Sequence, residues 1–493
     1  ANNIWDELGS LSARLPSALS ALFLMLIIAD TIYCSTKNLK EKIYLSLIAS
    51  LGFSLSPLII IWSRTAVSDS LLCSTLGISL LSFWRKFSSD DNNICITPWC
   101  FLGFAILTKG PVALVIIFST LFLFFLINKN WKELLFQINP LRGFLLTLLI
   151  SLPWYLGQFF YNGKQFWDNF FGYHNLQRYT SVVNNHSEPW WFFIFIMVLA
   201  SLPFSVFLFH GIFATFEDLI RKIKSKSDST GSIYLFSLCW LLSVFLFFSI
   251  SATKLTSYWI PAIPAASILI TKSAQTLINK KHKITTVWIF TTLILFGLSM
   301  AFYFSDSWLV LINDPEMPNL VNQIKNYGLI LKARIFLTAL TLLSILFVFK
   351  NFSRSILYLQ IFLFSGQLFL MPPIRKLADN LRQLPLRNIS KKIINTRLKS
   401  EPLAMIGIRK PSLHFYSEQI VFYEASSKIG IVNLSERFNF GKRSNLMDQP
   451  NYESGTFLVV IDKYSQQEKH WSTIRQQKIG VYGIYNLIRV KRK

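Results

Sequence analysis

Charged side chains are scarce in this sequence. Asp, Glu, Lys and Arg make up 15% of its 493 residues, whereas soluble domains average about 25%. Hydrophobic residues make up 52%, and runs such as 144–152 and 235–250 carry no charge. A helix needs about 20 apolar residues to cross the hydrocarbon layer. The runs are too many for one buried core, so the composition excludes a soluble single-core protein and indicates a multi-spanning membrane protein.

Other features are also rare or missing. No Gly-rich phosphate loop indicates a nucleotide site, no internal repeat is visible, and nothing favours a nucleic-acid partner. The cysteines lie in or beside apolar runs without metal-type spacing, so we interpret them as core residues rather than ligands or disulfides. They are Cys34, Cys73, Cys95, Cys100 and Cys239.

The apolar runs predict about twelve membrane helices and an all-α membrane domain over residues 1–371. We expect helices at 17–35, 43–62, 68–84, 95–107, 111–127, 140–160, 190–212, 232–251, 257–272, 285–304, 328–349 and 354–371.

Alternate connections between these helices are basic. The basic ones are 36–42, 85–94, 128–139, 213–231, 272–284 and 350–354. Because Lys and Arg are enriched in short cytoplasmic loops, we expect these six in the cytoplasm of a plasma (inner) membrane protein. The remaining connections, including the long loop 159–189, and the tail from 372 would then be extracytoplasmic.

The tail has a different composition. From Lys376 to Lys493 it holds 21 Lys and Arg against 9 Asp and Glu, a net charge of +12. Its short apolar stretches, 403–408, 420–423, 457–461 and 479–488, predict strands, and 465–477 predicts a helix. We expect a small α/β domain over 372–493. Its basic surface either is simply solvated or binds anionic headgroups or an anionic acceptor.

Polar side chains interrupt the apolar pattern at several predicted outer connections. Asp69 follows Arg64, Lys109 stands in Thr-Lys-Gly-Pro, and Lys254 precedes Tyr258 by four residues. Each has a bland interpretation: Arg64 and Asp69 can pair at a helix start, and the lysines can reach toward water. Charges at membrane depth cost at least ~2.5 kcal/mol, so they are usually paired or functional.

The long loop combines aromatic residues with His174, Arg178, His186 and Glu188. The histidines lack zinc-motif spacing, so a metal site is only weakly indicated. The pair Trp190-Trp191 fits an interfacial belt. Since the charge pattern puts all these groups on one face, together they suit an anionic lipid headgroup, with lysine as a point charge and arginine as a fork of donors.

Five segments in order resemble the GT-C-fold 4-amino-4-deoxy-L-arabinose transferases and related protein O-mannosyltransferase-like enzymes. The resemblance covers about residues 10–275. The segments are Ser12-Ala-Arg14-Leu-Pro16-Ser, Ala66-Val-Ser-Asp69, Leu107-Thr-Lys109-Gly110-Pro111, Leu152-Pro153-Trp154-Tyr155 with Asn175-Leu-Gln-Arg178-Tyr179 and Pro189-Trp190-Trp191, and Phe248-Ser-Ile-Ser-Ala-Thr-Lys254-Leu-Thr-Ser-Tyr258.

The resemblance implies an inverting glycosyltransferase that moves one sugar from a polyprenyl-phosphate donor to an acceptor outside the cytoplasm. The acceptor would be a lipid A-type glycolipid, a protein or a polysaccharide, and membrane lipids would surround the enzyme. The donor phosphate would be bound by Lys109, Arg178, Lys254 and Tyr258, with Asp69 as a catalytic carboxylate. Acceptor or metal contacts would involve His174, His186 and Glu188; no cofactor is firmly implied, and a divalent metal stays open.

The sequence departs from this family at two places. The histidine sometimes found three residues before Arg178 is replaced by Asn175, beside His174. Family members also have an earlier helix and an Asp-Glu loop ahead of the Ala-Arg-Leu-Pro segment, whereas this chain begins just before it. We therefore expect an N-terminal truncation that removes the probable general base.

A transporter or flippase for an anionic lipid is the competing hypothesis. It would also place cations in the membrane, but it predicts repeated halves and broken helices at the midplane. The sequence shows no repeat. A scaffold without catalysis is a third possibility, and loss of sugar transfer in variants of Lys109 or Arg178 would separate the three.

Overall fold

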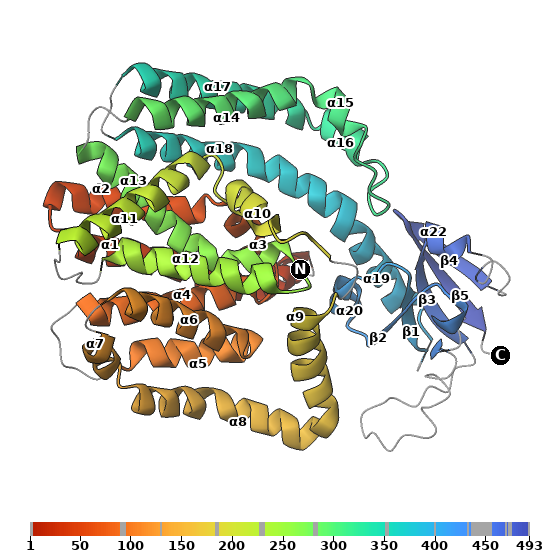
Figure 1. Cartoon of the computed structure of the whole chain (residues 1–493). Coiled ribbons are helices and arrows are strands. Elements are labelled where there is room, and N and C mark those ends of the chain that lie inside the picture. The colour runs from red at the N-terminus through yellow and green to blue at the C-terminus, as the bar shows by residue number, and fades with distance from the viewer. Residues whose placement is uncertain are drawn as a thin grey trace. The chain divides into compact units, whose positions relative to one another are not determined.

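The computed structural model (Figure 1) is dominated by helices, followed by one small sheet. It describes residues 3–88, 95–128, 131–182, 187–225, 232–279, 284–350, 354–398, 401–430, 433–434, 456–468, 471 and 476–491. The chain divides into two compact units. Unit 1 holds residues 1–299 and 337–365, and unit 2 holds residues 300–336 and 366–493.

Each predicted membrane helix coincides with one or two helices of the structure. The helices of the first 300 residues are α1 Asn3–Ser35, α2 Leu39–Ser54, α3 Pro57–Trp62, α4 Asp69–Ser88, α5 Thr97–Lys109, α6 Val112–Ile127, α7 Trp131–Gln137, α8 Pro140–Phe166, η1 Trp167–Gln177, α9 Arg178–Thr180, α10 Phe192–Ala200, α11 Ser205–Ser225, α12 Ile233–Ile250, η2 Thr256–Ala262, α13 Ile263–Asn279 and α14 Ile284–Tyr303. Later come α17 Leu329–Phe349 and α18 Ser355–Ala378.

Two predicted helices are broken. The segment 43–62 is split into α2 and α3 ahead of Pro57, and 190–212 is split into α10 and α11, which are bent by 110°. Proline lacks a backbone donor, so Pro57 and Pro203 cannot continue the hydrogen-bond ladder of the helix before them. The serine hydroxyl at the first break, Ser56, donates to the carbonyl of Ala200 at the second, 2.7 Å away.

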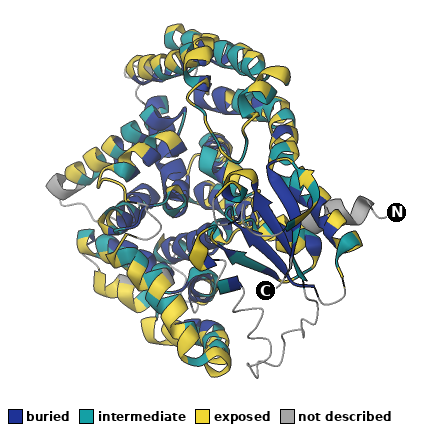
Figure 2. Ribbon diagram, turned by 90° about the vertical axis from the view of Figure 1, so that its right-hand side faces the viewer, coloured by how far each residue is buried: buried dark blue, intermediate teal, exposed yellow. Residues whose placement is uncertain are grey.

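The chain is a multi-pass membrane protein. Among the described residues, six helices are long and apolar enough to cross a bilayer, and the bent pair makes a seventh. The helix α8 exposes large apolar residues, such as Leu149 at 72% and Phe160 at 82% (Figure 2). Such surface is stable against lipid rather than water. The twelve crossings expected from the loop charges stay a prediction.

Unit 2 contains the predicted small α/β domain. Its sheet has the order β2-β1-β3-β5-β4, with β1 parallel to β2 and β3, and β5 antiparallel to β3 and β4. The strands are β1 Leu403–Ile406, β2 Val421–Glu424, β3 Thr456–Asp462, β4 Gln476–Tyr482 and β5 Tyr485–Lys491. The helices of unit 2 are α15 Ser305–Leu309, α16 Leu320–Asn326, η3 Asp379–Gln383, α19 Leu384–Thr396, α20 Pro411–Ser417 and α22 Lys463–Gln466.

Apolar side chains cover both faces of this sheet. One face packs against Leu386, Ile389 and Ile393 of α19, which are fully buried. The opposite face is covered by a second cluster that includes Leu434 and Trp471. The alternation of buried side chains in β1 and β3 places neighbouring residues on opposite faces, as expected for a strand.

Two details of the sequence prediction for the tail are wrong. The apolar stretch 479–488 is not one strand, because the chain turns at Gly483, whose φ of 60° is easily reached by glycine, and forms the hairpin β4–β5. The segment 465–477 is not a helix throughout, since α22 ends at Gln466 and β4 begins at Gln476.

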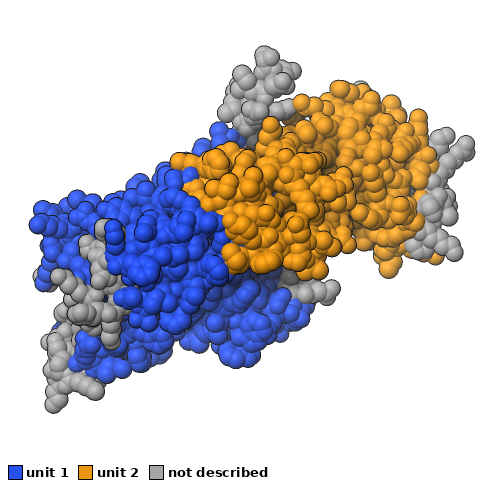
Figure 3. All heavy atoms as spheres, turned by 90° about the horizontal axis from the view of Figure 1, so that it is seen from above, with its two compact units in different colours: residues 1–299, 337–365 blue, residues 300–336, 366–493 orange. Residues whose placement is uncertain are grey.

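The compact units divide the chain differently from the boundary expected at residues 371 and 372. Residues 300–336 group with the sheet in unit 2 (Figure 3). Within unit 2, Glu316 pairs with Lys410 at 2.5 Å and Asp314 pairs with Arg382 at 3.6 Å. A soluble domain beginning at 372 stays a prediction.

Candidate functional site

A cavity of about 640 Å³ lies in unit 1. This volume falls in the range of about 300–1,000 Å³ that is usual for small-molecule sites. Its walls come from the start of α4, the junction of α5 and α6, the segment η1–α9, the end of α12 and the helix η2. Segments that are distant in the sequence therefore meet here, and they include four of the residues expected to act: Asp69, Lys109, Arg178 and Tyr258.

Asp69 and Lys109 form an ion pair at the wall of the cavity. Nζ of Lys109 lies 2.6 Å from Oδ1 of Asp69, and the two side chains are 30% and 14% exposed. Asp69 begins α4, where the helix dipole favours an acidic group. Lys109 ends α5, where the dipole favours a cation. The pair therefore connects two helix ends of opposite polarity.

Gly110 sets the direction of the chain after Lys109. Its φ of 77° and ψ of −149° lie in a region that L side chains rarely adopt. A Cβ at this position would stand 3.0 Å from the ring of Phe170. Glycine therefore lets η1 approach the α5–α6 junction, and Pro111 then starts the next helix, as the sequence predicted.

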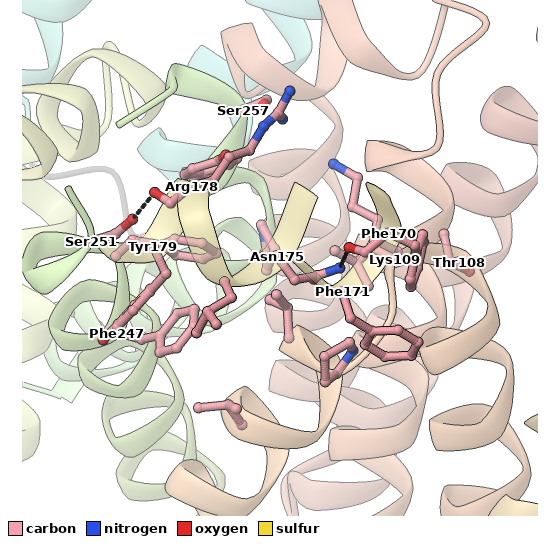
Figure 4. Close-up of a pocket in the computed structure, with 18 of the residues that line it drawn as sticks. Thr108, Lys109, Phe170, Phe171, Asn175, Arg178, Tyr179, Phe247, Ser251 and Ser257 are labelled. Carbon is pink, nitrogen blue, oxygen red and sulfur yellow. Dashed lines mark hydrogen bonds between the residues drawn. The ribbon is translucent and has the colours of Figure 1, made fainter. Parts of the chain in front are cut away.

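Arg178 is held by a short extended segment. Its carbonyl accepts from the N–H of Thr253 at 3.2 Å, and the carbonyl of Tyr179 accepts from the N–H of Ala252 at 2.9 Å. The hydroxyl of Ser251 lies 3.5 Å from the Arg178 carbonyl (Figure 4). Nε of Arg178 is buried and has no hydrogen-bond partner among the described residues. A buried charged donor without a partner costs free energy that an anionic ligand would recover.

Aromatic side chains form much of the remaining wall. Tyr179 stacks on Phe247 with ring centroids 5.0 Å apart, and Tyr258 stacks on Phe248 at 4.8 Å. In Figure 4 the cationic ends of Lys109 and Arg178 lie at the upper end of the view, and the ring of Phe171 lies lower. The cavity thus combines a cationic end with an apolar wall.

Lys254 does not line the cavity. It is 8% exposed, and its Nζ donates to the carbonyl of Ser251 at 2.8 Å. Because Ser251 and its neighbours hold the backbone of Arg178 and Tyr179, Lys254 supports the segment that positions Arg178.

Of the three residues expected to bind a metal or acceptor, only Glu188 has a side chain that the structure describes, so this expectation stays a prediction. His174 lies in η1, Glu188 is exposed after the loop, and His186 lies outside the described residues. In the described part of the chain, no three His, Cys, Asp or Glu residues are grouped so as to hold a metal ion. The amide of Asn175, which replaces the family's histidine, donates to the carbonyl of Phe170 at 2.7 Å.

The sequence gave several wall residues no role of their own. Phe170, Phe247, Phe248 and Ser257 line the cavity; Phe248 and Ser257 fall in the fifth family-like segment, but the sequence holds 45 Phe residues. A Phe that faces a site and one that faces lipid occupy the same kind of apolar run. Polar residues in such runs are rare, which is why Lys109 and Arg178 were identified.

Two family models match parts of the sequence. Residues 3–156 match the model described as dolichyl-phosphate-mannose-protein mannosyltransferase, and residues 396–493 match the cyanobacterial RgtA-type glycosyltransferase, C-terminal domain. The two matches fall on the membrane helices and on the sheet domain.

Individual relatives give a consistent picture. An undecaprenyl phosphate-alpha-4-amino-4-deoxy-L-arabinose arabinosyl transferase of Wigglesworthia glossinidia brevipalpis is 30% identical over 294 residues, which cover 57% of this chain and 49% of that protein. The enzyme of the same name from Erwinia tasmaniensis is 29% identical over 209 residues, covering 42% of this chain and 36% of that protein. The matches therefore span between about a third and half of the relatives' length.

A solved structure shares the fold. The crystal structure of ArnT from Cupriavidus metallidurans bound to undecaprenyl phosphate has a TM-score of 0.75 at 18% identity and covers 97% of this chain and 83% of that one. Its apo structure gives 0.72 at 17% identity, with the same coverage. The chain therefore shares the fold of the ArnT structures, and two separate parts of its sequence are similar to glycosyltransferase families.

Proposed function

We propose that the protein transfers a single sugar from a polyprenyl-phosphate donor to an acceptor outside the cytoplasm. One observation carries the proposal: a largely apolar, aromatic cavity has Lys109 and Arg178 at one end, and Nε of Arg178 is buried without a partner among the described residues. A polyprenyl phosphate combines the two matching properties, because it joins an apolar chain to an anionic group. The two matched family models and the two relatives are all named as transferases, which favours transfer over transport.

The cations act on the leaving group. An acceptor oxygen, from a phosphate or from a hydroxyl that gives up its proton to a carboxylate or to water, bonds to the anomeric carbon. The bond from that carbon to the phosphate oxygen breaks, and its electron pair passes to the lipid phosphate. Lys109 and Arg178 stabilise the growing phosphate charge, and the Tyr258 hydroxyl donates a hydrogen bond to it. Attack from the face opposite the leaving group inverts the anomeric centre.

Asp69 has two possible parts in this reaction. A carboxylate can accept the proton of an acceptor hydroxyl. In the structure, however, Asp69 is 2.6 Å from Lys109, and this contact favours a positioning role. We propose that Asp69 holds Lys109 toward the cavity and that Lys254 acts indirectly, through the backbone of Ser251, on Arg178.

The cellular setting is part of the proposal. We propose that the protein lies in the plasma (inner) membrane with the sheet domain of unit 2 outside the cytoplasm, and the alternation of basic short connections supports this orientation. One matched family model is named for proteins as acceptors, whereas the names of the relatives give a sugar donor, carried on undecaprenyl phosphate, and no acceptor. We keep a lipid A-type glycolipid, a protein and a polysaccharide as the acceptor classes.

Donor binding tests the proposal without requiring turnover. We would measure the affinity of the purified chain for undecaprenyl phosphate and for undecaprenol by native mass spectrometry. Loss of one charged hydrogen bond costs about 1.5–3 kcal/mol, so Arg178→Gln should weaken undecaprenyl phosphate binding roughly 10- to 100-fold. The affinity for undecaprenol should not change.

A matched control is Lys164→Gln, which removes an exposed positive charge from the end of α8 outside the cavity lining. Its phosphate affinity should equal that of the unchanged chain. Equal affinities for the two lipids in the unchanged chain would overturn the proposed site. Movement of the lipid across a vesicle without sugar transfer from a glycosylated donor would instead support a flippase.

A further inference from the structure

The helix α18 changes character along one face. Its segment 355–374 carries no charged residue, and Ile361, Phe364 and Leu368 on it are between 47% and 66% exposed. Spacings of three and four residues keep these positions on the same side of a helix. The next exposed positions on that side are Pro372 and Arg375, with Lys376 beside them. An apolar, lipid-facing surface thus runs directly into two cations.

The length of the uncharged segment fixes the level of these cations. At 1.5 Å per residue, 20 residues extend about 30 Å, which is the thickness of the hydrocarbon layer. Arg354 stands just before this segment, and Arg375 and Lys376 stand just after it. The two ends of the span are therefore both marked by positive residues, and Arg375 and Lys376 lie where the helix enters the headgroup region.

Among the described residues, no carboxylate forms an ion pair with either of these two cations. Both are exposed. From 375 to 397 the sequence has seven Lys and Arg residues and one acidic residue, Asp379, which pairs with Arg387. Farther along, Arg382 pairs with Asp314. Within the described ranges, Arg375 and Lys376 thus keep their charge available to a ligand, whereas Arg382 and Arg387 farther along are paired.

We infer that Arg375 and Lys376 form a binding surface for anionic phospholipid headgroups at the point where α18 leaves the bilayer. The bilayer is the occupant because the apolar half of the same face is already a lipid contact. Each Lys or Arg near an anionic membrane surface is attracted to it, so two adjacent cations favour anionic over zwitterionic headgroups. The inference does not depend on glycosyl transfer or on which side of the membrane this end faces.

Local lipid composition can be measured with a fluorophore. We would place bimane on Ala378→Cys, an exposed position in the last turn of α18, in a Cys34→Ser background. The full chain would be put into nanodiscs with phosphatidylglycerol or phosphatidylcholine, each carrying the same nitroxide near its headgroup. At equal mole fraction, phosphatidylglycerol should quench several-fold more strongly, and about 1 M salt should remove most of the difference by screening.

Arg375→Gln with Lys376→Gln should bring the ratio of the two lipids close to one. The matched control, Lys428→Gln with Lys463→Gln, removes two exposed charges from the sheet domain and should leave the ratio unchanged. Equal quenching by the two lipids in the unchanged chain would overturn the inference, as would an equal loss of preference in the control. If the double variant fails to fold, the difference in quenching between the two lipids in the unchanged chain still tests the inference.

Discussion

At the residue scale, the ion pair of Asp69 and Lys109 separates two roles for the carboxylate. If Asp69 positions Lys109, Asp69→Asn should weaken undecaprenyl phosphate binding roughly tenfold, an effect of about 1.4 kcal/mol. Lys109→Gln should have a similar effect, and the double variant should lose little more, since the two residues act as a unit. Native mass spectrometry would give the affinities of the unchanged chain, the two single variants and the double variant, which together form a double-mutant cycle. Additive losses would show that each residue acts alone.

Gly110 offers a second prediction at this scale. Gly110→Ala should lower the free energy of unfolding by about 1–3 kcal/mol, the usual cost of a residue held at an unfavourable φ, and it should push Phe170 away from the α5–α6 junction. Gly157→Ala is the control, because a Cβ there meets nothing within 4 Å and α8 has ordinary helical geometry at that point. The unfolding temperature and the donor affinity should both be lower in Gly110→Ala, and neither should fall in Gly157→Ala. Equal behaviour of the two variants would contradict this account.

The charged residues that the sequence predicted for the site and that line the cavity share one property. Asp69, Lys109 and Arg178 are charged groups within an apolar context, where charge is costly and therefore informative. Lys254 has the same property, yet the structure shows it at the backbone of Ser251 rather than in the cavity wall. Spacing along the chain could not distinguish a lysine that reaches a ligand from one that supports a neighbouring segment. The aromatic wall was hidden among lipid-facing phenylalanines.

At the element scale, hydropathy predicted where helices exist but not how they bend. The segments around Ser56 and Pro203 are largely apolar and carry no charge, so their average hydropathy predicts one helix for each. The breaks depend on a tertiary contact, the hydrogen bond from Ser56 to Ala200, as well as on the prolines. In the tail, the apolar stretch 479–488 crosses the hairpin turn at Gly483, and apolar residues on both sides of the turn concealed it.

A buried ion pair lies in the sheet domain and should make the stability of this domain sensitive to acid. The Glu401 carboxylate is fully buried and accepts from Nε of Arg489 at 2.8 Å and from Thr456 at 2.7 Å. Burial alone raises the pKa of Glu401, but the hydrogen bonds from Arg489, Thr456 and the N–H of Leu398 outweigh burial and lower the pKa below its ordinary value. Its stabilising contribution is therefore present above the unfolded-state pKa of about 4.3 and is lost as the pH falls through the lower, folded-state pKa.

Hydrogen exchange of the full chain tests this linkage. With intrinsic rates corrected for pH, protection of the amides of β3 and β5 should decline below about pH 4.3. Glu401→Gln should reduce protection at neutral pH by about 1–3 kcal/mol, because Arg489 loses its anionic partner, and should remove most of the acid dependence. Glu418→Gln, at an exposed position after α20, is the control. An unchanged acid profile in Glu401→Gln would refute the assignment.

At the scale of the whole molecule, the uneven distribution of charge is the feature that a fold comparison does not explain. The chain has 49 Lys and Arg residues against 25 Asp and Glu, and half of the net charge of +24 lies after residue 375. The positive-inside rule concerns short loops near membrane spans and does not fix the side of a folded domain. Basic short loops and a basic sheet domain can therefore lie on opposite sides of the membrane. The sequence alone predicts the side of the loops more firmly than the side of the sheet domain.

Labelling of single cysteines can establish on which side of the membrane the first basic loop and the sheet domain each lie. In a Cys34→Ser background the other four cysteines are buried or half-buried, so reporters at exposed lysines dominate the signal. A membrane-impermeant maleimide on intact cells should label Lys463→Cys in the sheet domain and leave Lys40→Cys, in the first basic loop, unlabelled until the membrane is opened. Both positions are exposed, so a difference reports sidedness rather than burial. Labelling of both positions, or of neither, in intact cells would place the loop and the sheet domain on one side, and a donor site facing the extracytoplasmic space would then lose its main support.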